Sequence, residues 1–390
     1  MLAKLRNLFG TDSRDSSETA ISFDGIERLE SRQMMAGNVS LVLSPTGNLT
    51  INGDNLDNEL FIEGIGRRKI EVTGGDGTQI SFEGRSADRH VLSISSPAWE
   101  LDRTNLTGNL RIDLRGGNDN VHINNVNVEG NVVSSMGAGD DQLQLNSVQV
   151  DRGLTFLGGA GSNRDGLFVL NSSVGGHTRS VLGGSNTHDN FVSTNSTFAG
   201  NLVVSQTSGE ASVVLYESVV GGRTNVATGS GTDNVTVMSS TVAATSISMG
   251  SGIDRLDILG TELDGAANFN LGIGNDETSI TSSDFVSSLL LNLGSGNDSA
   301  QFDDAMTART FRILAGSGDD YLEIDDHDFR SSFYVSFGAG DDELDFDGAS
   351  ATVSSVRVVG GAGYDVVHDT ARLSTSTLPS YTSIEWTTDF

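Results

Sequence analysis

The chain has 390 residues, no cysteine, and 52 acidic against 23 basic residues, which gives a formal net charge of −29 at pH 7. The lack of cysteine excludes a disulfide framework, a thiolate metal site and a thiol nucleophile. The negative charge repels phosphate backbones and anionic lipid headgroups, so we expect no nucleic-acid partner, whereas cations suit such a surface. No run of about 18 apolar residues occurs, so we expect no insertion into a membrane.

Residues 1–37 lack the repeat found in the rest of the chain, and they contain no apolar segment long enough for an ordinary secretory signal. Residues 29–37 read LESRQMMAG. This stretch resembles the LEPR-XLL motif near the N-terminus of planctomycete surface and exported proteins, with Ser31 in place of the usual proline and methionines in place of leucines. The resemblance implies a targeting segment, processing near Ala36, and an extracellular or cell-surface location. A disordered tail is the alternative.

Residues 38–102 alternate apolar and polar positions, as in NLTINGDNLDNELFI at 48–62, but with a blurred period. We predict atypical opening coils here, because the first turns of a stacked repeat must cover its open core. From 103 to 365 the period is regular, and we expect residues 366–390 to close the other end.

The regular part repeats the signature G-x-G-x-D about every 22 residues. The gap of 92 residues between the second and third of these aspartates holds degraded loops in the same period. The aspartates that end the signature, including the close variant RGGND at the first of them, are Asp119, Asp141, Asp233, Asp254, Asp276, Asp298, Asp320, Asp342 and Asp365.

Apolar residues alternate on both sides of each signature, which predicts strands with one buried face. Around Asp298 they are Leu289, Leu291, Leu293, Ala300 and Phe302. A 22-residue unit of this kind has no core of its own, so the units must stack and share an interior. We therefore predict an all-β fold, a single right-handed parallel β-helix over residues 38–390, three-sided, with about 12 to 14 coils. A sandwich of hairpins would need a turn signal about every 8 to 12 residues, and the sequence gives one per coil.

The loops resemble the calcium-binding nonapeptide of repeats-in-toxin (RTX) proteins, although only GGAGYD at 360–365 carries the full opening of that motif. The resemblance implies calcium held between loops by aspartate carboxylates and backbone carbonyls. The toxin-type turn uses two tandem nonapeptides, whereas this chain has one such loop per coil. Only one edge of the solenoid could then carry a ladder of metal ions.

Stacking also makes a physical demand on these aspartates. In register, equivalent residues of neighbouring coils lie about 4.8 Å apart, so the nine carboxylates repel one another. Bound calcium would offset the repulsion and makes the nine aspartates candidate metal ligands. Alternatively, each carboxylate accepts amide hydrogen bonds within its own turn and needs no metal. The sequence leaves both open.

The period is most disturbed between residues 158 and 216, where two loops are longer than the rest. Because local breaks in a repeat often mark function, we take Arg164, Asp165, His188 and Asp189 as candidate ligand-binding residues for an acidic polysaccharide. We find no H-E-x-x-H, G-x-S-x-G or P-loop motif, so enzyme activity stays undecided, with a polysaccharide lyase or glycoside hydrolase as the class to consider.

Together these observations predict a secreted or cell-surface structural or adhesive solenoid, stabilised by calcium ions and in contact with envelope or extracellular polysaccharide. A carbohydrate-binding or polysaccharide-cleaving β-helix is the alternative. The oligomeric state is not determined by the sequence.

Overall fold

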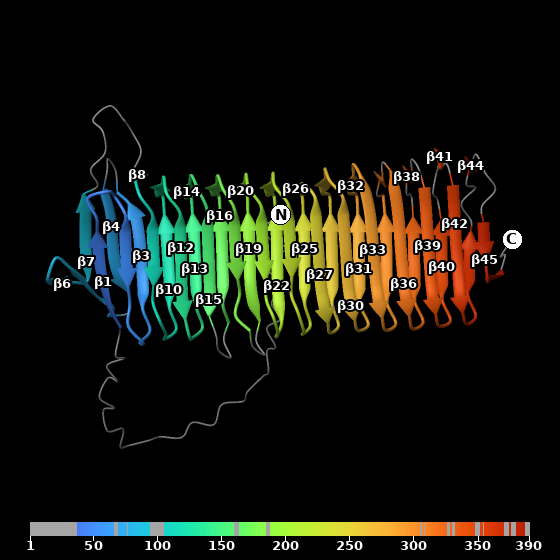
Figure 1. Cartoon of the computed structure of the whole chain (residues 1–390), viewed down its shortest axis with the longest axis horizontal. Coiled ribbons are helices and arrows are strands. Elements are labelled where there is room, and N and C mark those ends of the chain that lie inside the picture. Colours follow the sequence, from blue (N-terminus) through green and yellow to red (C-terminus); the bar gives the residue numbers. More distant parts are fainter. Residues whose placement is uncertain are drawn as a thin grey trace, which may run out of the picture. The chain divides into compact units, whose positions relative to one another are not determined.

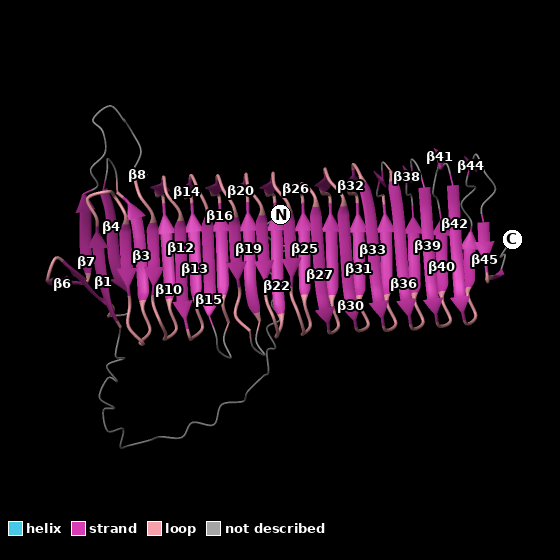
Figure 2. Ribbon diagram, viewed as in Figure 1, coloured by secondary structure: helices cyan, strands magenta, loops and turns pink. Residues whose placement is uncertain are grey.

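The structure is a computed structural model. It describes residues 37–390, apart from 66–68, 76, 94–104, 160–163, 185–187, 305, 308, 326–327, 330–331, 348–351, 354, 370–373, 376–379 and 387–390. The chain divides into residues 1–34 and 35–390, and the first unit, with the predicted targeting motif up to Ala36, lies outside the described residues. Figure 2 shows that the described part consists of strands and loops. It holds no helix long and apolar enough to cross a membrane.

The strands form a parallel β-solenoid in which each coil contributes one strand to each of three sheets (Figure 1). One coil consists of β33 (Ser288–Ser295), β34 (Ser299–Asp303) and β35 (Met306–Thr307). The next coil pairs in parallel with it, Leu289 opposite Phe311, 22 residues along the chain. The predicted all-β parallel β-helix with a period of about 22 residues is confirmed.

We name the sheets A, B and C in the order in which a coil passes through them. The parallel run of sheet A consists of β2 (Leu49–Asn52), β9 (Leu110–Asp113), β12 (Val132–Gly137), β15 (Leu154–Gly159), β18 (Thr178–Val181), β21 (Leu202–Ser205), β24 (Thr224–Ala227), β27 (Thr245–Ser251), β30 (Ala267–Ile273), β33, β36 (Thr310–Ser317), β39 (Ser332–Ala339), β42 (Ser355–Ala362) and β45 (Ser380–Thr382).

Sheet B follows the aspartate corner. Its parallel run consists of β3 (Glu59–Gly64), β10 (Asn120–Asn124), β13 (Gln142–Asn146), β16 (Gly166–Leu170), β19 (Asp189–Thr194), β22 (Ala211–Tyr216), β25 (Asn234–Met238), β28 (Arg255–Leu259), β31 (Glu277–Thr281), β34, β37 (Tyr321–Asp325), β40 (Glu343–Asp347), β43 (Val366–Asp369) and β46 (Glu385–Trp386).

Sheet C has 11 two-residue strands in the described part of the chain, so about eleven coils are complete. They are β8 (Asn105–Leu106), β11 (Asn127–Val128), β14 (Gln149–Val150), β17 (Ser173–Val174), β20 (Thr197–Phe198), β23 (Val219–Val220), β26 (Thr241–Val242), β29 (Glu262–Leu263), β32 (Asp284–Phe285), β35 and β38 (Asp328–Phe329). A separate parallel pair joins β41 (Thr352–Val353) to β44 (Ser374–Thr375).

The apolar residues that flank each signature fill the interior, as their alternation predicts. Around Asp298, the side chains of Leu289, Leu291, Leu293 and Phe302 are all buried. Their packing partners lie in neighbouring coils: the rings of Phe311 and Phe333, one coil apart, stack with centroids 5.4 Å apart. The core therefore exists only between coils, and no coil is stable without its neighbours.

The two glycines of each signature let the coils approach closely at the corner between sheets A and B. Gly294 and Gly296 have φ values of 115° and 130°. A Cβ added to Gly294 would overlap the carbonyl oxygen of Gly272 in the preceding coil, and one added to Gly296 would overlap that of Gly274. Both positions therefore require glycine for conformation and for space.

The opening segment, predicted to form atypical coils, pairs largely antiparallel. Only β2 and β3 continue the parallel stack, by pairing with β9 and β10. The strands that cover them are β1 (Asn38–Leu43), β4 (Lys69–Gly75), β5 (Gln79–Phe82), β6 (Arg85–Ala87) and β7 (Arg89–Ser93). Antiparallel pairing joins β1 to β2, β3 to β4 and β4 to β7, so the backbone groups of the first coil do not end as an open parallel edge.

At the other end, the parallel register continues past Asp365 into the segment predicted to close the solenoid. Arg357 pairs with Ser380 and Val366 with Glu385. The strands involved, β45 and β46, have three and two residues. Very short edge strands offer little backbone to a foreign strand, so they protect this end against edge-to-edge pairing.

The corner glycines give a first test. We expect Gly316→Ala to lower the free energy of unfolding by about 3 kcal/mol, because its Cβ would overlap the carbonyl of Gly294 and its φ of 119° is strained for alanine. Gly260→Ser is the matched control, since nothing lies within 4 Å of its Cβ position and Ser239 and Ser282 adopt the same conformation one coil away on either side. Thermal unfolding followed by circular dichroism measures both. Equal melting temperatures for the two variants would contradict this account of the corner.

Candidate functional site: a buried column of aspartates

All nine predicted aspartates lie in one column, at the corner between sheets A and B, directly before each strand of sheet B. None of the nine is more than 2% exposed. The structure also places Asp165 and Asp189 in this column, because Gly166 and Asn190, which follow them, occupy the register of Gln142 in sheet B. The signal in the sequence was the spacing: Asp141, Asp165 and Asp189 follow one another at 24 residues, one coil with a loop two residues longer.

The carboxylates join each coil to the one before it. The amide of Asp276 donates to Oδ1 of Asp298 at 2.8 Å, and the amide of Asp298 donates to Oδ1 of Asp320 at 2.9 Å. The same bond links Asp119 to Asp141, Asp141 to Asp165, Asp165 to Asp189, Asp233 to Asp254, Asp254 to Asp276, Asp320 to Asp342 and Asp342 to Asp365. The column thus bonds across the gap between coils, whereas the metal-free alternative placed these hydrogen bonds within each turn.

A second ladder runs beside the first in the opposite direction, one residue earlier in the sequence. Oδ1 of Asn297 accepts a hydrogen bond from the amide of Asp319 in the next coil at 3.0 Å, and Oδ1 of Asp319 accepts one from Asp341 at 2.9 Å. Asn297 and Asp319 are exposed. Either Asn or Asp serves at this position, since the bond needs only the oxygen.

The second carboxylate oxygen distinguishes the buried column from this outer ladder. At the two coils whose facing residue in sheet A is glycine, Gly158 and Gly360 lie against Oδ2 of Asp165 and Asp365, so this oxygen points toward the inner side of the corner. There it is shielded from water and accepts no hydrogen bond in Asp119, Asp141, Asp189, Asp254, Asp276, Asp298 and Asp320. An ionised carboxylate in such a position costs free energy, because burial favours its neutral form.

The pKa values of the column show this cost. Burial is the main cause of a rise in pKa from the ordinary 3.8; the hydrogen bond from the preceding coil lowers the pKa again, and neighbouring carboxylates in the column raise it further. The pKa is raised to about 8 for Asp119, to about 7 for Asp141, Asp189, Asp254 and Asp320, and to about 6 for Asp165, Asp298 and Asp342. At neutral pH these carboxyls therefore lie close to the point where they exchange a proton.

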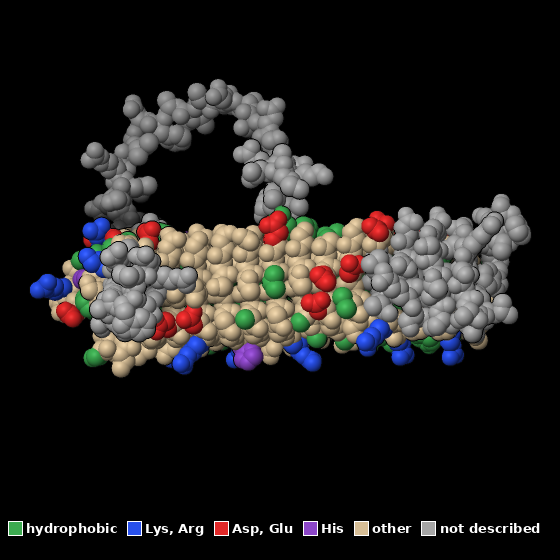
Figure 3. Space-filling model, turned by 90° about the horizontal axis from the view of Figure 1, so that it is seen from above, with side chains coloured by type: hydrophobic (Ala, Val, Ile, Leu, Met, Phe, Trp, Pro, Cys, Tyr) green, Lys and Arg blue, Asp and Glu red, His purple; other side chains and the backbone are tan. Residues whose placement is uncertain are grey.

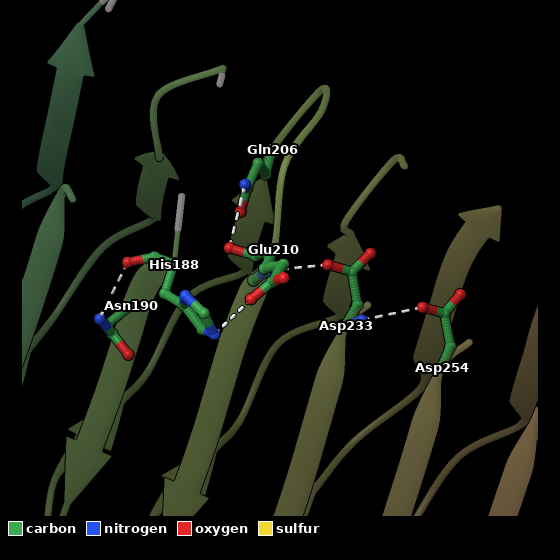
Figure 4. Close-up of polar contacts among 7 residues, drawn as sticks. His188, Asn190, Gln206, Glu210, Asp233 and Asp254 are labelled. Carbon is green, nitrogen blue, oxygen red and sulfur yellow. Dashed lines mark hydrogen bonds and ion pairs between the residues drawn. The ribbon is translucent and has the colours of Figure 1, made fainter. Parts of the chain in front are cut away.

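The column is broken at one coil, where Ala211 stands in the aspartate position (Figure 4). The amide of Asp189 donates to the backbone carbonyl of Glu210 at 2.8 Å, and the amide of Ala211 donates to Oδ1 of Asp233 at 2.7 Å. The buried side chain of Gln206 donates to the carbonyl of Ser208 at 2.8 Å. The break divides the column into four aspartates before it and seven after it.

The four residues predicted to bind an acidic polysaccharide do not share one surface. Asp165 and Asp189 are buried in the column. Arg164 is exposed, and the exposed side chain of His188 contacts the carboxylate of Glu210 (Figure 4). A sugar on the outer surface could reach Arg164 and His188, but not the two carboxylates.

Only pairs of column carboxylates from neighbouring coils could share a cation. Among the described residues, no three His, Cys, Asp or Glu side chains lie close enough together to hold a metal ion. A cation at this corner would therefore need backbone carbonyl oxygens in addition to two carboxylates. Such a mixed oxygen shell is acceptable to calcium.

The chain matches no protein-family model, and comparisons with curated proteins and with solved structures yield no match.

Substitution of Asp298 separates the hydrogen bond from the charge. Asp298→Ala removes the acceptor for the amide of Asp276 and should lower the free energy of unfolding by about 1 to 2 kcal/mol. Asp298→Asn keeps an accepting oxygen without an ionisable group, so at pH 8 with chelator we expect it to melt no lower than the unmodified chain. Thermal unfolding measures both, with exposed Asn297→Ala as the control for side-chain truncation at the same corner. If the Asn and Ala variants melt together, the hydrogen bond between coils does not contribute as described.

The raised pKa values also predict how stability depends on pH. In the unfolded chain these carboxyls lose their protons near the ordinary pKa of 3.8, but in the folded chain only at about 6 to 8. Between these limits the folded state binds more protons, so the free energy of unfolding falls as pH rises. We therefore expect the metal-free protein to lose melting temperature steadily from about pH 4 to about pH 8. A melting temperature that rises over this interval would show that the column is ionised in the folded protein without penalty.

Proposed function

We propose that the chain is an exported structural solenoid, a scaffold of the cell surface or extracellular space, whose aspartate column is neutralised by bound calcium. The observation that carries the proposal is the row of buried Oδ2 atoms without a hydrogen-bond partner, repeated in successive coils. A stack of in-register coils is stiff and long relative to its width, which suits a structural or adhesive role. No catalytic group is needed for it.

The column carboxylates from Asp233 to Asp365 would hold the cations, in pairs from neighbouring coils. When bound, calcium supplies the positive charge that buried carboxylates otherwise lack. Calcium prefers oxygen ligands and accepts carboxylate and carbonyl oxygens together. The resemblance of the G-x-G-x-D loops to the RTX motif supports the same assignment.

The choice of residue at each position also supports a need for charge. One residue earlier in the loop, Asn118, Asn275 and Asn297 alternate with aspartates. In the buried column Asn occurs only at the first coil, where Asn58 takes the place of an aspartate and donates its amide to Oδ1 of Asp119 at 2.8 Å. If the hydrogen bond between coils were the whole requirement, Asn would satisfy it at every coil without a desolvated charge.

An extracellular location is consistent with this chemistry. Extracellular calcium modules bind with dissociation constants of about 0.1 to 1 mM, the range over which weak, repeated sites fill outside cells. The LEPR-XLL resemblance of residues 29–37 points to the same location. A contact with envelope polysaccharide belongs to this proposal, but the described residues do not yet supply a binding site for it.

Calcium titration tests the proposal on the full chain. At pH 7.5, chelator should lower the melting temperature, millimolar calcium should restore it, and magnesium at equal concentration should not, because it binds all-protein oxygen cages poorly. Equilibrium dialysis with metal analysis should find several calcium ions per chain. A variant with Asn at Asp276, Asp298 and Asp320 should bind fewer ions and respond less to calcium.

The outcomes distinguish calcium from protons. An unchanged melting temperature across millimolar calcium, together with a fall in stability from pH 4 to pH 8, would show that protons alone neutralise the column and would overturn the calcium assignment. Binding that persists in the triple Asn variant would place calcium elsewhere on this acidic chain.

A further inference from the structure

The outer faces of the solenoid differ in charge to a degree that the net charge of −29 hides. From β12 to β42, the described strands of sheet A contain no aspartate or glutamate at all; their charged residues are Arg179, Arg312 and Arg357. Sheet B has the opposite character over the same C-terminal coils. The space-filling view shows such segregation, with Lys and Arg side chains projecting along one edge and Asp and Glu on the face beside it (Figure 3).

The basic part of sheet A is a single file of three outward side chains. Arg312, Tyr334 and Arg357 are register neighbours on β36, β39 and β42. The guanidinium carbon of Arg312 lies 5.0 Å from the centre of the Tyr334 ring, and that of Arg357 lies 5.8 Å from it. We call this file the arginine face. The ring holds both guanidinium groups by cation–π contacts and leaves them at the surface.

The acidic part of sheet B occupies β34, β37 and β40 in the same coils. Its outward side chains include Asp303, Glu323 and Asp345, which we call the acidic face. Glu323 is the register neighbour of Asp345, and Asp303 is that of Asp325. Like charges at such spacing destabilise a sheet. The described part of the chain offers no ion pair to Asp303, Glu323 or Asp345, although Arg255 bridges Asp257 and Glu277 two coils away.

We propose that the arginine face of one copy of this chain docks on the acidic face of a second copy. The charges are complementary, and both faces repeat along the solenoid axis with the same step of about 4.8 Å. Arg312 and Arg357 lie two coils apart, as do the acids of β34 and β40. Two solenoids side by side therefore bring both arginines opposite carboxylates in one register.

The composition of the arginine face favours a protein partner over a polysaccharide. Tyr and Arg are the residue types enriched at the centres of protein interfaces. The half-buried Leu290 and Leu314 lie beside them on sheet A and add apolar contact. The acidic face supplies the matching charge on the same molecule, so no foreign partner has to be assumed.

The arrangement also determines the kind of assembly. The two faces are different surfaces, so each contact leaves one arginine face and one acidic face unused. Such a heterologous contact does not close on itself unless it forms a ring, and it extends into rows of parallel solenoids. A row of this kind fits a structural role but does not depend on the calcium assignment.

Sedimentation velocity of the full chain in chelator tests the proposal and excludes calcium bridging. We expect association that grows with protein concentration and weakens about tenfold or more at high salt, because the contact is charged. Arg312→Glu with Arg357→Glu should abolish it, and so should Glu323→Arg with Asp345→Arg, since each double variant meets a like charge. Arg179→Glu is the control, because it lies in the same file of sheet A, where the sheet B strands of its own and the next coil, β19 and β22, carry no outward acid.

Mixing the two double variants gives the decisive result. Each alone should stay monomeric, and the mixture should associate, because the reversed faces complement each other. Circular dichroism confirms that both variants fold. A monomeric unmodified chain at low salt, or a mixture that fails to associate, would overturn the proposal. Binding of polygalacturonate to a monomeric chain, lost in the arginine variant, would overturn it in favour of an acidic polysaccharide.

Discussion

The parallel, in-register stacking of one coil on the next is the constraint on which the whole structure depends. A coil of about 22 residues has no interior of its own, so every apolar side chain is buried by residues from the coils before and after it. Stacking at about 4.8 Å also puts identical backbone atoms and identical side chains next to one another along the entire solenoid. Each feature of the corner follows from this spacing. Gly272 and Gly294 must be glycine because any Cβ would occupy the position of a carbonyl oxygen in the neighbouring coil.

The same spacing converts one residue per coil into a column with collective properties. A single buried aspartate bonded to an amide would be an ordinary structural feature. In a column, each member desolvates and repels its neighbours, and the pKa of the carboxyls rises to about 6 to 8. The chain thereby gains hydrogen bonds between coils but has to neutralise a row of charges inside the protein. The outer charges obey the same rule, since the acids of sheet B are stacked on one another while sheet A carries arginines.

Much of this architecture could be predicted from the residues. The alternation around Asp298 gave the strands and the buried faces, and the recurrence of G-x-G-x-D gave the period and the nine aspartates of the column. Asp165 and Asp189 were taken for a separate binding site, because longer loops hide their register in the sequence. Only strand pairing shows that Gly166 and Asn190 stand in the position of Gln142. The antiparallel opening segment was likewise not visible, since alternation is the same in both pairing directions.

The sequence by itself determined the all-β class, the period, the residues that face inward and the corner at which the aspartates lie. These depend on local spacing and on side-chain chemistry, which a linear chain carries in full. Only the tertiary structure decided where the hydrogen bonds of the aspartates go. The carboxylate of Asp298 accepts the amide of Asp276, 22 residues earlier, and its second oxygen lies buried without a partner. That outcome depends on the distance and direction between coils, which are set by packing of the whole stack rather than by any one repeat.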